Sequence, residues 1–376
     1  MLIITGVITP LVRALYDPSK KYMTYKRRTI LQLKPNTELR LLACIHSGDH
    51  IPAMMSIVEV SNHTQQNPIG VYVLHLIELL GRSTTLLISH DERYKTPPSN
   101  LVSLSQRVVL AFRNYGKKYK DSLSVQSYTS ISSYETMDDD VCTLALKKRV
   151  SLIIIPFYEK WAPLRSMNSN VLNKAPCSVA VTVDRGLLRS YKHATEFSVV
   201  VFFLGGADDR ETLAYGTRMV GNVKVKLTVV RFLPYQKAWE SQLDNIVMAD
   251  FRVKTLGNER VTYREEVVMD GGKTVSVIRS MESDYQLIMV GRRHEEESPL
   301  IEGLLEWKNE ETLLGPIGDY FASSDFQGSA TVMVVQQQTN VVPGSSDDNL
   351  EDLIPLEIRA SHDQEGGSRR VLIQKE

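Results

Sequence analysis

Cysteine is scarce in this 376-residue chain, and that scarcity excludes several kinds of site. Only Cys44, Cys142 and Cys177 occur, widely spaced and without a CxxC pair or a cysteine–histidine cluster. An odd, scattered set argues against a disulfide framework and against a structural zinc site, and it suits a reducing compartment such as the cytosol. Each cysteine lies among apolar residues, so we expect all three in the core.

Excess charge is also lacking, because Lys+Arg and Asp+Glu both total 44. The chain as a whole therefore has no electrostatic signature of nucleic-acid binding, and we expect no nucleic-acid partner. The eight histidines show neither an HExxH motif nor paired-ligand spacing, so we expect no metal site. No Walker-type loop or catalytic triad order emerges either, so we expect no catalytic residue and no enzyme.

A long hydrophobic run is missing as well. Residues 1–12 are apolar and uncharged, but a membrane-spanning helix needs about 20 such residues. The basic residues follow this run, whereas a signal peptide carries its positive charge first. Two interpretations fit: residues 1–16 are the end of a membrane helix followed by a basic juxtamembrane linker at 17–35, or they are a short leader on a soluble protein. The linker could also bind anionic lipid, at about 1 kcal/mol per basic residue.

Strands and helices alternate from Glu38 onward, and near-continuous apolar runs such as 152–155 are typical of a parallel sheet covered on both faces. We predict an α/β fold with two tandem doubly wound five-stranded parallel-sheet units, in domains at 36–186 and 187–338, followed by a disordered acidic and polar tail at 339–376. The expected strands are 39–45, 69–77, 123–128, 152–156, 178–183, 197–204, 225–232, 262–266, 287–291 and 330–336. The expected helices are 52–62, 101–119, 136–147, 168–174, 210–221, 235–255, 274–281 and 315–323.

One strand-to-helix turn is the most informative local feature. The apolar run 199–204 breaks at Gly205 and Gly206, and Asp208 and Asp209 follow. The glycine pair permits positive φ, and the free amides at the start of the next helix suit an anion. Paired carboxylates repel phosphate, however, and either aspartate can cap the helix. The letters therefore fit a phosphate-binding turn and also a plain turn with a cap.

A second group of polar residues follows later strands. In open α/β sheets, ligands lie beyond the carboxyl ends of the strands, where two arginines follow one strand and a glycine-containing turn opens a helix. The arginines could hold an anionic ligand bidentately, or they could pair with the acidic run at 295–297. Together with the glycine turn, the candidate ligand or sensor residues here are Gly291, Arg292, Arg293, Gly318 and Asp319.

This arrangement resembles the universal stress protein fold, whose nucleotide-binding members carry Gly-x-x-Gly after the fourth strand and a later Gly-Ser or Gly-Thr. The corresponding letters here are GRRH at 291–294 and Gly318-Asp319. His294 replaces the glycine that allows close backbone approach, and Asp319 puts a negative charge where a hydroxyl would meet phosphate. Both departures oppose nucleotide binding, so we expect no cofactor; the second domain is the one where a nucleotide could still bind. None is expected in the first, where Pro156 and Phe157 follow the fourth strand without a glycine.

Longer motifs carry a second resemblance, which covers residues 1–338. The chain resembles the cytosolic region of plant cation/proton exchangers of the monovalent cation:proton antiporter-2 superfamily. The runs that carry it are RLLACIH at 40–46, IIPF at 154–157, NVLNKAPCSVAVTVDRG at 170–186, GGADDRETLAYGTRM at 205–219, VGRR at 290–293 and LGPIGDYFASSDF at 314–326. In that family the cytosolic region follows the last transmembrane helix, so the resemblance favours the membrane-helix interpretation of residues 1–16.

The resemblance implies the regulatory cytosolic portion of a potassium/proton antiporter, acting in potassium and pH homeostasis. Such transporters exchange ions with carboxylates buried in the membrane bundle, and residues 1–16 contain no acidic residue, so the chain is not expected to transport alone. The implied partners are the membrane-embedded antiporter domain and a second copy of the chain, with the domains facing the cytosol from an endomembrane or the plasma membrane. The alternative is a soluble nucleotide-binding protein of the universal stress type.

Overall fold

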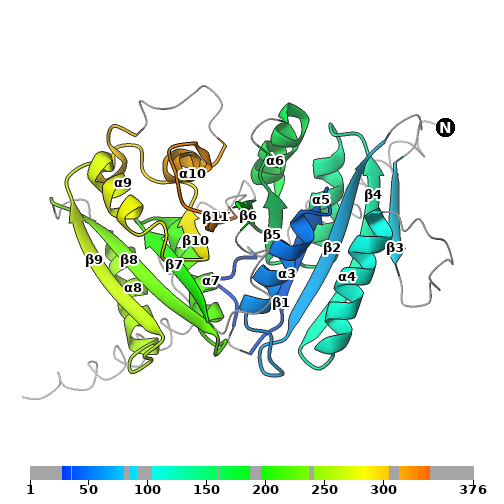
Figure 1. The fold of residues 1–376 in the computed structure, drawn as a ribbon, viewed down its shortest axis with the longest axis horizontal. Helices are drawn as coiled ribbons and strands as arrows, with labels where there is room; N and C mark the ends of the chain where they lie inside the picture. Colours follow the sequence, from blue (N-terminus) through cyan, green and yellow to red (C-terminus); the bar gives the residue numbers. More distant parts are fainter. Residues whose placement is uncertain are drawn as a thin grey trace, which may run out of the picture.

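A single sheet of eleven strands organises the part of the chain that the structure describes. This computed structural model describes residues 28–34, 36–79, 85–90, 104–158, 161–186, 196–236, 241–304 and 313–338. The strand order is β3-β4-β2-β1-β5-β6-β11-β10-β7-β8-β9, and the two halves of the chain occupy the two halves of the sheet (Figure 1). The predicted α/β class with parallel strands between covering helices is confirmed.

The first half contributes six of the described strands. Its elements are β1 (Leu39–Ile45), α3 (His50–Val60), β2 (Ile69–Glu78), β3 (Leu86–His90), α4 (Leu104–Lys118), β4 (Leu123–Ser132), α5 (Met137–Lys147), β5 (Leu152–Pro156), α6 (Ala162–Lys174) and β6 (Ser178–Val183). All pair in parallel except β3, which lies antiparallel to β4 at the edge of the sheet. The sequence did not predict β3, a short edge strand whose apolar run is only three residues long and lies exposed.

The second half repeats the arrangement with five parallel strands. Its elements are β7 (Phe197–Phe203), α7 (Ala207–Met219), β8 (Val225–Pro234), α8 (Gln242–Lys254), β9 (Val261–Val268), α9 (Gly271–Ser280), β10 (Leu287–Gly291), the short 3-10 helix η3 (Pro299–Ile301), α10 (Gly315–Ala322) and β11 (Thr331–Gln336). Strand β10 lies between β7 and β11, and β8 lies between β7 and β9.

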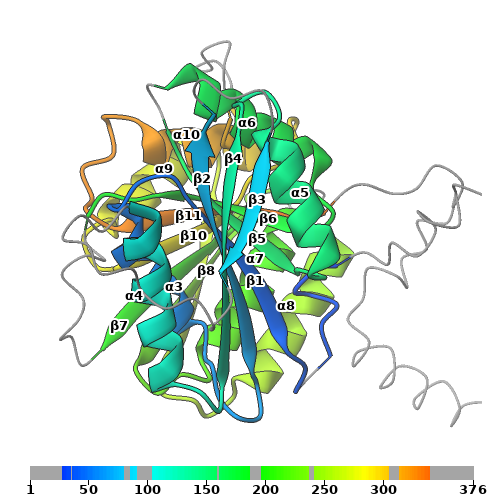
Figure 2. The same cartoon turned by 90° about the vertical axis from the view of Figure 1, so that its right-hand side faces the viewer.

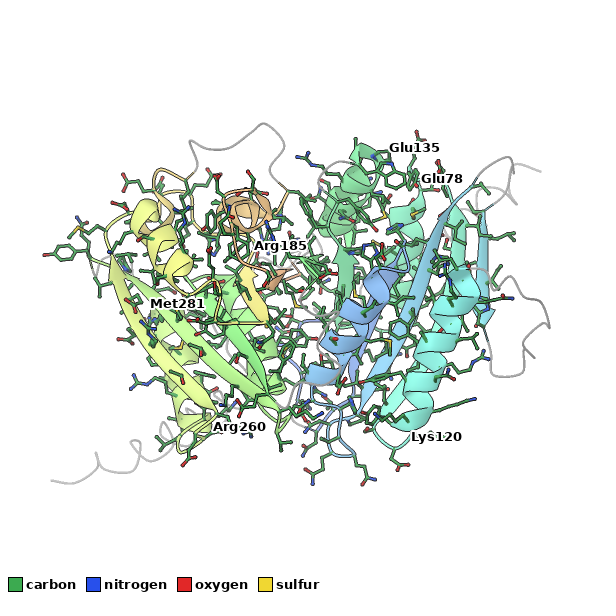
Figure 3. All side chains as sticks on the ribbon, in the orientation of Figure 1. Glu78, Lys120, Glu135, Arg185, Arg260 and Met281 are labelled. Carbon is green, nitrogen blue, oxygen red and sulfur yellow. The ribbon has the colours of Figure 1, made fainter. Side chains whose placement is uncertain are left out.

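The two halves join through their last strands. Strands β6 and β11 pair antiparallel, with Val181 opposite Val334. Arg185, just after β6, donates hydrogen bonds to the carbonyls of Phe321 and Ser323 at 2.8 and 2.7 Å, and it lies beside α10 (Figure 3). Pairing two buried edges satisfies amides that would otherwise lack partners. The sequence predicted two tandem units but did not indicate that they share one sheet.

Two apolar layers cover the sheet, and each extends across both halves. Alternate residues of one strand face opposite layers: Val200 and Phe202 belong to the layer that contains residues of α5, α6, α9 and α10, whereas Val199 and Val201 belong to the layer that contains residues of α3, α4, α7 and α8. Seen from the β3 edge, α3 and α4 lie on one side of the strands and α5 on the other (Figure 2). The continuity of both layers makes the two halves one packed body.

The described chain begins with the end of the predicted basic linker. Arg28 forms a parallel bridge with Cys177, and Ile30 is buried. We call residues 28–34 the linker segment. The predicted membrane-helix end at 1–16, the rest of the linker and the predicted tail at 339–376 lie outside the described residues. Within the described ranges, no helix is both long and apolar enough to cross a membrane.

Candidate functional site

The glycine turn between β7 and α7 has the positive φ angles that the sequence predicts. Gly205 and Gly206 have φ of 115° and 95°, which only glycine adopts readily, and Gly206 is the N-cap of α7. The prediction that Asp208 or Asp209 caps this helix was wrong, since no side chain caps it. Helix α7 begins at Ala207 instead of Arg210, so both aspartates lie inside the first turn and reach donors elsewhere.

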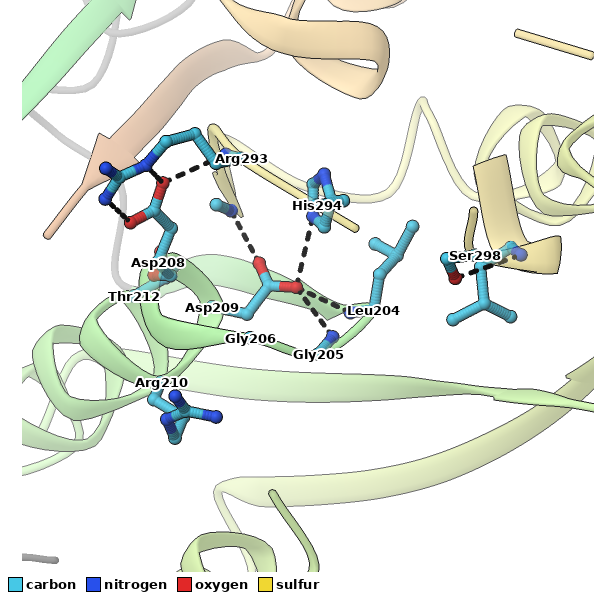
Figure 4. A network of polar contacts seen from close by, with 12 residues as sticks. Leu204, Gly205, Gly206, Asp208, Asp209, Arg210, Thr212, Arg293, His294 and Ser298 are labelled. Atoms are coloured by element: carbon cyan, nitrogen blue, oxygen red, sulfur yellow. Dashed lines mark hydrogen bonds and ion pairs between the residues drawn. The ribbon is translucent and has the colours of Figure 1, made fainter. Parts of the chain in front are cut away.

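Asp209 fills the amide-lined turn with its own carboxylate. Its Oδ2 accepts hydrogen bonds from the amides of Leu204 and Gly205 at 2.7 and 2.9 Å, and its Oδ1 accepts one from the amide of Gly291 at 2.6 Å (Figure 4). Converging backbone amides of this kind bind phosphate in other α/β proteins. Here the anion position is occupied by a fully buried side chain of the same chain.

His294 packs onto the same carboxylate. Its Nε2 lies 3.2 Å from Asp209 Oδ2, and only 3% of the side chain is exposed. Burial alone would lower the pKa of His294, but the charge and hydrogen bond of Asp209, with the charge of Asp208, outweigh it and raise the pKa. The ring Nδ1 is buried and has no hydrogen-bond partner among the described residues. The histidine thus lies where a phosphate-binding protein would have glycine, and it forms a buried pair with the carboxylate.

Asp208 holds the second arginine of the candidate site. The guanidinium of Arg293 donates to Asp208 in a bidentate pair, with Nε–Oδ2 at 2.8 Å and Nη2–Oδ1 at 2.5 Å. The amides of Arg293 and Gln337 add hydrogen bonds to the same carboxylate, each at 2.9 Å. The interpretation that the arginines pair with the acidic run was wrong, although Arg293 does form an ion pair. Its partner is Asp208, 85 residues away, and not the acidic run at 295–297.

Arg292, directly after β10, and Asp319, in α10, are the remaining charged residues of the candidate site. Arg292 donates to the carbonyl of Leu313 at 2.7 Å and to Gln336 Oε1 at 2.8 Å, and burial lowers its pKa. Asp319 Oδ1 accepts from the amide of Leu314 at 3.1 Å, whereas its buried Oδ2 has no partner among the described residues. Burial raises the pKa of Asp319.

Gly318 has a packing role. A Cβ at this position would lie 2.7 Å from Leu314 Cβ and 3.1 Å from a Val334 methyl, so glycine allows α10 to pack closely on β11. The structure therefore brings the predicted residues together at one edge of the sheet, but most of their polar side-chain atoms are already bonded within the chain.

The space left at this edge is small. Beyond the ends of β7 and β8 lies a cavity of about 60 Å³, lined by Gly205, Gly206, Phe232, Asp244, His294 and others. Pockets for small-molecule ligands and cofactors measure about 300–1,000 Å³. Asp244, which forms a buried ion pair with Arg210, lines this cavity. Most polar groups of this cluster are hydrogen-bonded within the chain, and the cavity beside them is too small for a nucleotide.

Sequence reasoning missed Glu211, whose carboxylate lies between three parts of the chain. This side chain on α7 is fully buried. Its Oε1 accepts from the amide of Ile30 at 2.6 Å and from Ser178 Oγ at 2.7 Å, and its Oε2 accepts from the amide of Leu31 at 3.1 Å. Burial raises the pKa of Glu211, and these hydrogen bonds oppose that shift. Glu211 therefore ties the linker segment to β6 of the first half and α7 of the second.

Comparison with known proteins identifies the family. A family model described as "Plant cation/H(+) antiporter, C-terminal domain" matches residues 196–336, and a second, "Plant cation/H(+) antiporter domain", matches residues 71–187. The chain belongs to the plant cation/H(+) antiporter family. The two matched ranges meet close to the boundary between the two halves of the sheet.

Curated relatives agree with this assignment to the plant cation/H(+) antiporters. The chain is 40% identical to Cation/H(+) antiporter 15 of Arabidopsis thaliana, over 89% of this chain and 45% of that protein. It is 39% identical to the chloroplastic Cation/H(+) antiporter 23, over 90% and 42%, and 36% identical to Cation/H(+) symporter 13, over 90% and 42%, both of the same plant. The chain thus spans less than half the length of these relatives, which are transporters.

Solved structures resemble the chain more distantly. The cytoplasmic domain of a prokaryotic cation chloride cotransporter is 8% identical, covers 80% of this chain and 96% of its own, and has a TM-score of 0.47. A universal stress protein from Archaeoglobus fulgidus is 10% identical, covers 79% and 96%, and has a TM-score of 0.43. These likenesses concern the fold alone.

Proposed function

We propose that this chain is the regulatory cytosolic portion of a monovalent cation/proton antiporter, with potassium as the cation and a role in potassium and pH homeostasis. On this proposal it does not transport alone. The membrane-embedded antiporter domain is its partner, and the described domains face the cytosol. The observation that carries the proposal is the pair of hydrogen bonds that the linker segment donates to the buried carboxylate of Glu211.

These hydrogen bonds support regulation because they couple the position of the linker segment to the packing of both halves. The amides of Ile30 and Leu31 bind a carboxylate from one half, and the same carboxylate accepts from Ser178 of the other half. A shift between the halves would therefore break or strain the linker contact. A transporter with two arrangements of its membrane domain is biased by any difference in free energy that the linker transmits.

Transport measurements on the antiporter that contains this chain test the proposal. In vesicles loaded with potassium, proton flux is followed with a pH-sensitive dye for the wild type, Glu211→Gln and Glu259→Gln. Glu259 is an exposed acidic residue on the same half and serves as the matched control. We expect Glu211→Gln to change the rate of exchange or its pH dependence, and Glu259→Gln to leave both unchanged. Identical behaviour of all three proteins would contradict the proposal.

Sodium in place of potassium tests the cation. If exchange runs equally well with sodium alone, the assignment of potassium is wrong. Since one relative is named a symporter, the direction of proton movement should be recorded in the same experiment. With potassium inside the vesicles and none outside, proton influx as potassium leaves supports antiport, whereas proton efflux contradicts it.

We also propose that the second domain takes no nucleotide, against the alternative of a nucleotide-binding stress protein. The Asp209 carboxylate at the amide-lined turn and the cavity of about 60 Å³ support this. Calorimetric titration with ATP, AMP and NAD should give no saturable heat. Saturable heat that is lost in Arg292→Ala/Arg293→Ala would contradict it.

Two further partners remain predictions from the sequence. If the basic linker binds anionic lipid, the chain should float with anionic vesicles, and it should float less when Lys20, Lys21 and Lys26 are replaced by Gln. A homodimer predicts twice the chain mass in light scattering at micromolar concentration.

A further inference from the structure

A second cavity is lined by residues of α7, α8 and the linker segment. It measures about 380 Å³. Its walls are mainly aliphatic and aromatic, with Leu31, Leu33, Leu213, Ala214 and Phe251 among them. This volume accommodates a few apolar side chains or a small ligand. None of the nine residues predicted as a ligand site lines it.

The rim of this cavity is basic. It carries Lys34, Arg210, Arg218 and Lys254 against a single acidic residue, Asp250. Arg210 and Lys254 have carboxylate partners on α8. Arg218 donates only to two backbone carbonyls before β2, at 3.3 and 3.4 Å, and its buried Nε has no partner. Among the residues that the structure describes, no carboxylate is paired with Lys34 or Arg218. The cavity therefore combines apolar walls with the positive charges of Lys34 and Arg218, which have no carboxylate partner among the described residues.

The chain itself contains a segment of complementary composition. Residues 347–358, DDNLEDLIPLEI, carry five acidic residues and no basic residue, with aliphatic side chains between them. The segment follows Gln338, whose Oε1 accepts a hydrogen bond from the amide of Arg28 at 2.8 Å. The described chain thus ends beside the linker segment that walls the cavity.

Chain length allows the segment to reach the cavity. At about 3.3 Å per residue, residues 338 and 347 can be roughly 30 Å apart. By the same measure Lys34 lies no more than roughly 20 Å from Arg28, which contacts Gln338. We propose that residues 347–358 dock in this cavity, with their aliphatic side chains against Leu213, Ala214 and Phe251 and their carboxylates toward Lys34 and Arg218.

A docked tail would cover the linker segment that Glu211 holds, and would oppose its movement. This consequence rests on the proposed regulatory function, whereas the docking itself does not. The tail would then act as a built-in ligand of the linker.

Peptide binding to the full-length chain tests the docking. A tail variant with Leu353→Ser, Ile354→Ser and Leu356→Ser has its own segment disabled. A fluorescein-labelled peptide of residues 345–360 should bind this variant saturably, as measured by fluorescence anisotropy. It should bind the wild-type chain at least roughly tenfold more weakly, because an intact tethered tail competes at an effective concentration near the millimolar range. A peptide with the same three serines is the control and should not bind.

Two cavity variants, each made in the tail variant, locate the binding. Ala214→Trp fills the cavity, and Lys34→Glu reverses a charge on its exposed rim; both should weaken peptide binding by tenfold or more. Because Lys34 is exposed, Lys34→Glu keeps the test valid if Ala214→Trp does not fold. The proposal is overturned if the peptide binds wild type and tail variant equally, or if Lys34→Glu and a folded Ala214→Trp bind it unchanged.

A lipid is the competing occupant. If the tail variant binds vesicles of anionic phospholipid in a manner lost with Ala214→Trp, and does not bind the peptide, the cavity holds a lipid and the proposal is wrong. Peptide binding is measured without transport. Intact peptide binding beside an inert Glu211→Gln in the flux assay would therefore overturn only the proposed regulatory function.

Discussion

Removal of the Asp209 carboxylate is the sharpest test of the polar cluster. In Asp209→Ala, the amides of Leu204, Gly205 and Gly291 lose their shared acceptor, and His294 loses its partner. Each buried donor left without a partner costs about 1–3 kcal/mol, and breaking a buried charged pair typically costs about 3–5 kcal/mol in all. Since domains have stabilities of about 5–15 kcal/mol, we expect a large fall in the midpoint of urea denaturation.

The same variant should acquire an anion site. With the carboxylate gone, three amides and the imidazole of His294 face the vacated position, so sulfate should bind there and stabilise the variant. A ligand at a hundred times its Kd adds about 2.7 kcal/mol. Urea denaturation of Asp209→Ala with increasing sodium sulfate, at constant ionic strength against sodium chloride, measures the effect.

The wild-type chain is the control for this titration. Sulfate stabilises proteins generally by exclusion from their surfaces, so only the excess stabilisation of Asp209→Ala over wild type counts. If Asp209→Ala loses less than about 1 kcal/mol, or gains no more from sulfate than wild type does, the carboxylate is not filling an anion site.

Three further predictions concern neighbouring groups. Burial raises the pKa of Glu211, so ionisation of its carboxyl group opposes folding. Relative to Glu211→Gln, the stability of the wild type should therefore fall as pH rises through the raised folded pKa. Urea denaturation from pH 4 to 8 measures this, and a constant difference in stability between the two proteins would refute it. Asp209 raises the pKa of His294, so its contribution is complete below the unfolded pKa and is lost as pH rises through the folded pKa; NMR titration of the ring should give a midpoint above about 6.5, and a lower midpoint would contradict the pairing. A Cβ in Gly291→Ala would lie 2.5 Å from Asp209 Oδ1 and 2.8 Å from its amide, so this variant should lose about 1–3 kcal/mol in thermal denaturation, whereas the exposed Gly272→Ala should lose less than about 1 kcal/mol.

Several features of the fold could be predicted because their causes are local. Strands β1, β5, β7 and β10 are predominantly apolar, and their expected bounds agree with the structure to within one residue. The positive φ of Gly205 and Gly206 follows from the tight turn after β7. Strand β3 was not predicted, because an apolar run of three residues is too short to distinguish a strand from a loop, and the pairing with β4 decides its conformation.

Partners across long sequence distances could not be predicted. Arg293 had an acidic run two to four residues away, yet it pairs with Asp208, because the turn after β7 lies beside the end of β10 in the sheet. In the sequence, Glu211 looks like any acidic residue on a helix. It is a buried hydrogen-bond acceptor only because Ile30 and Leu31, 181 and 180 residues earlier, lie against it.

The sequence by itself determined the α/β class, the family resemblance and the glycine turn, since these depend on residues close together in the chain. The tertiary structure alone decided that β6 and β11 join the halves in one sheet, that Asp209 occupies the turn, and that Glu211 holds the linker. The physical reason is that a buried polar group takes whichever partner the fold brings within hydrogen-bond distance, and that choice depends on how the strands are ordered.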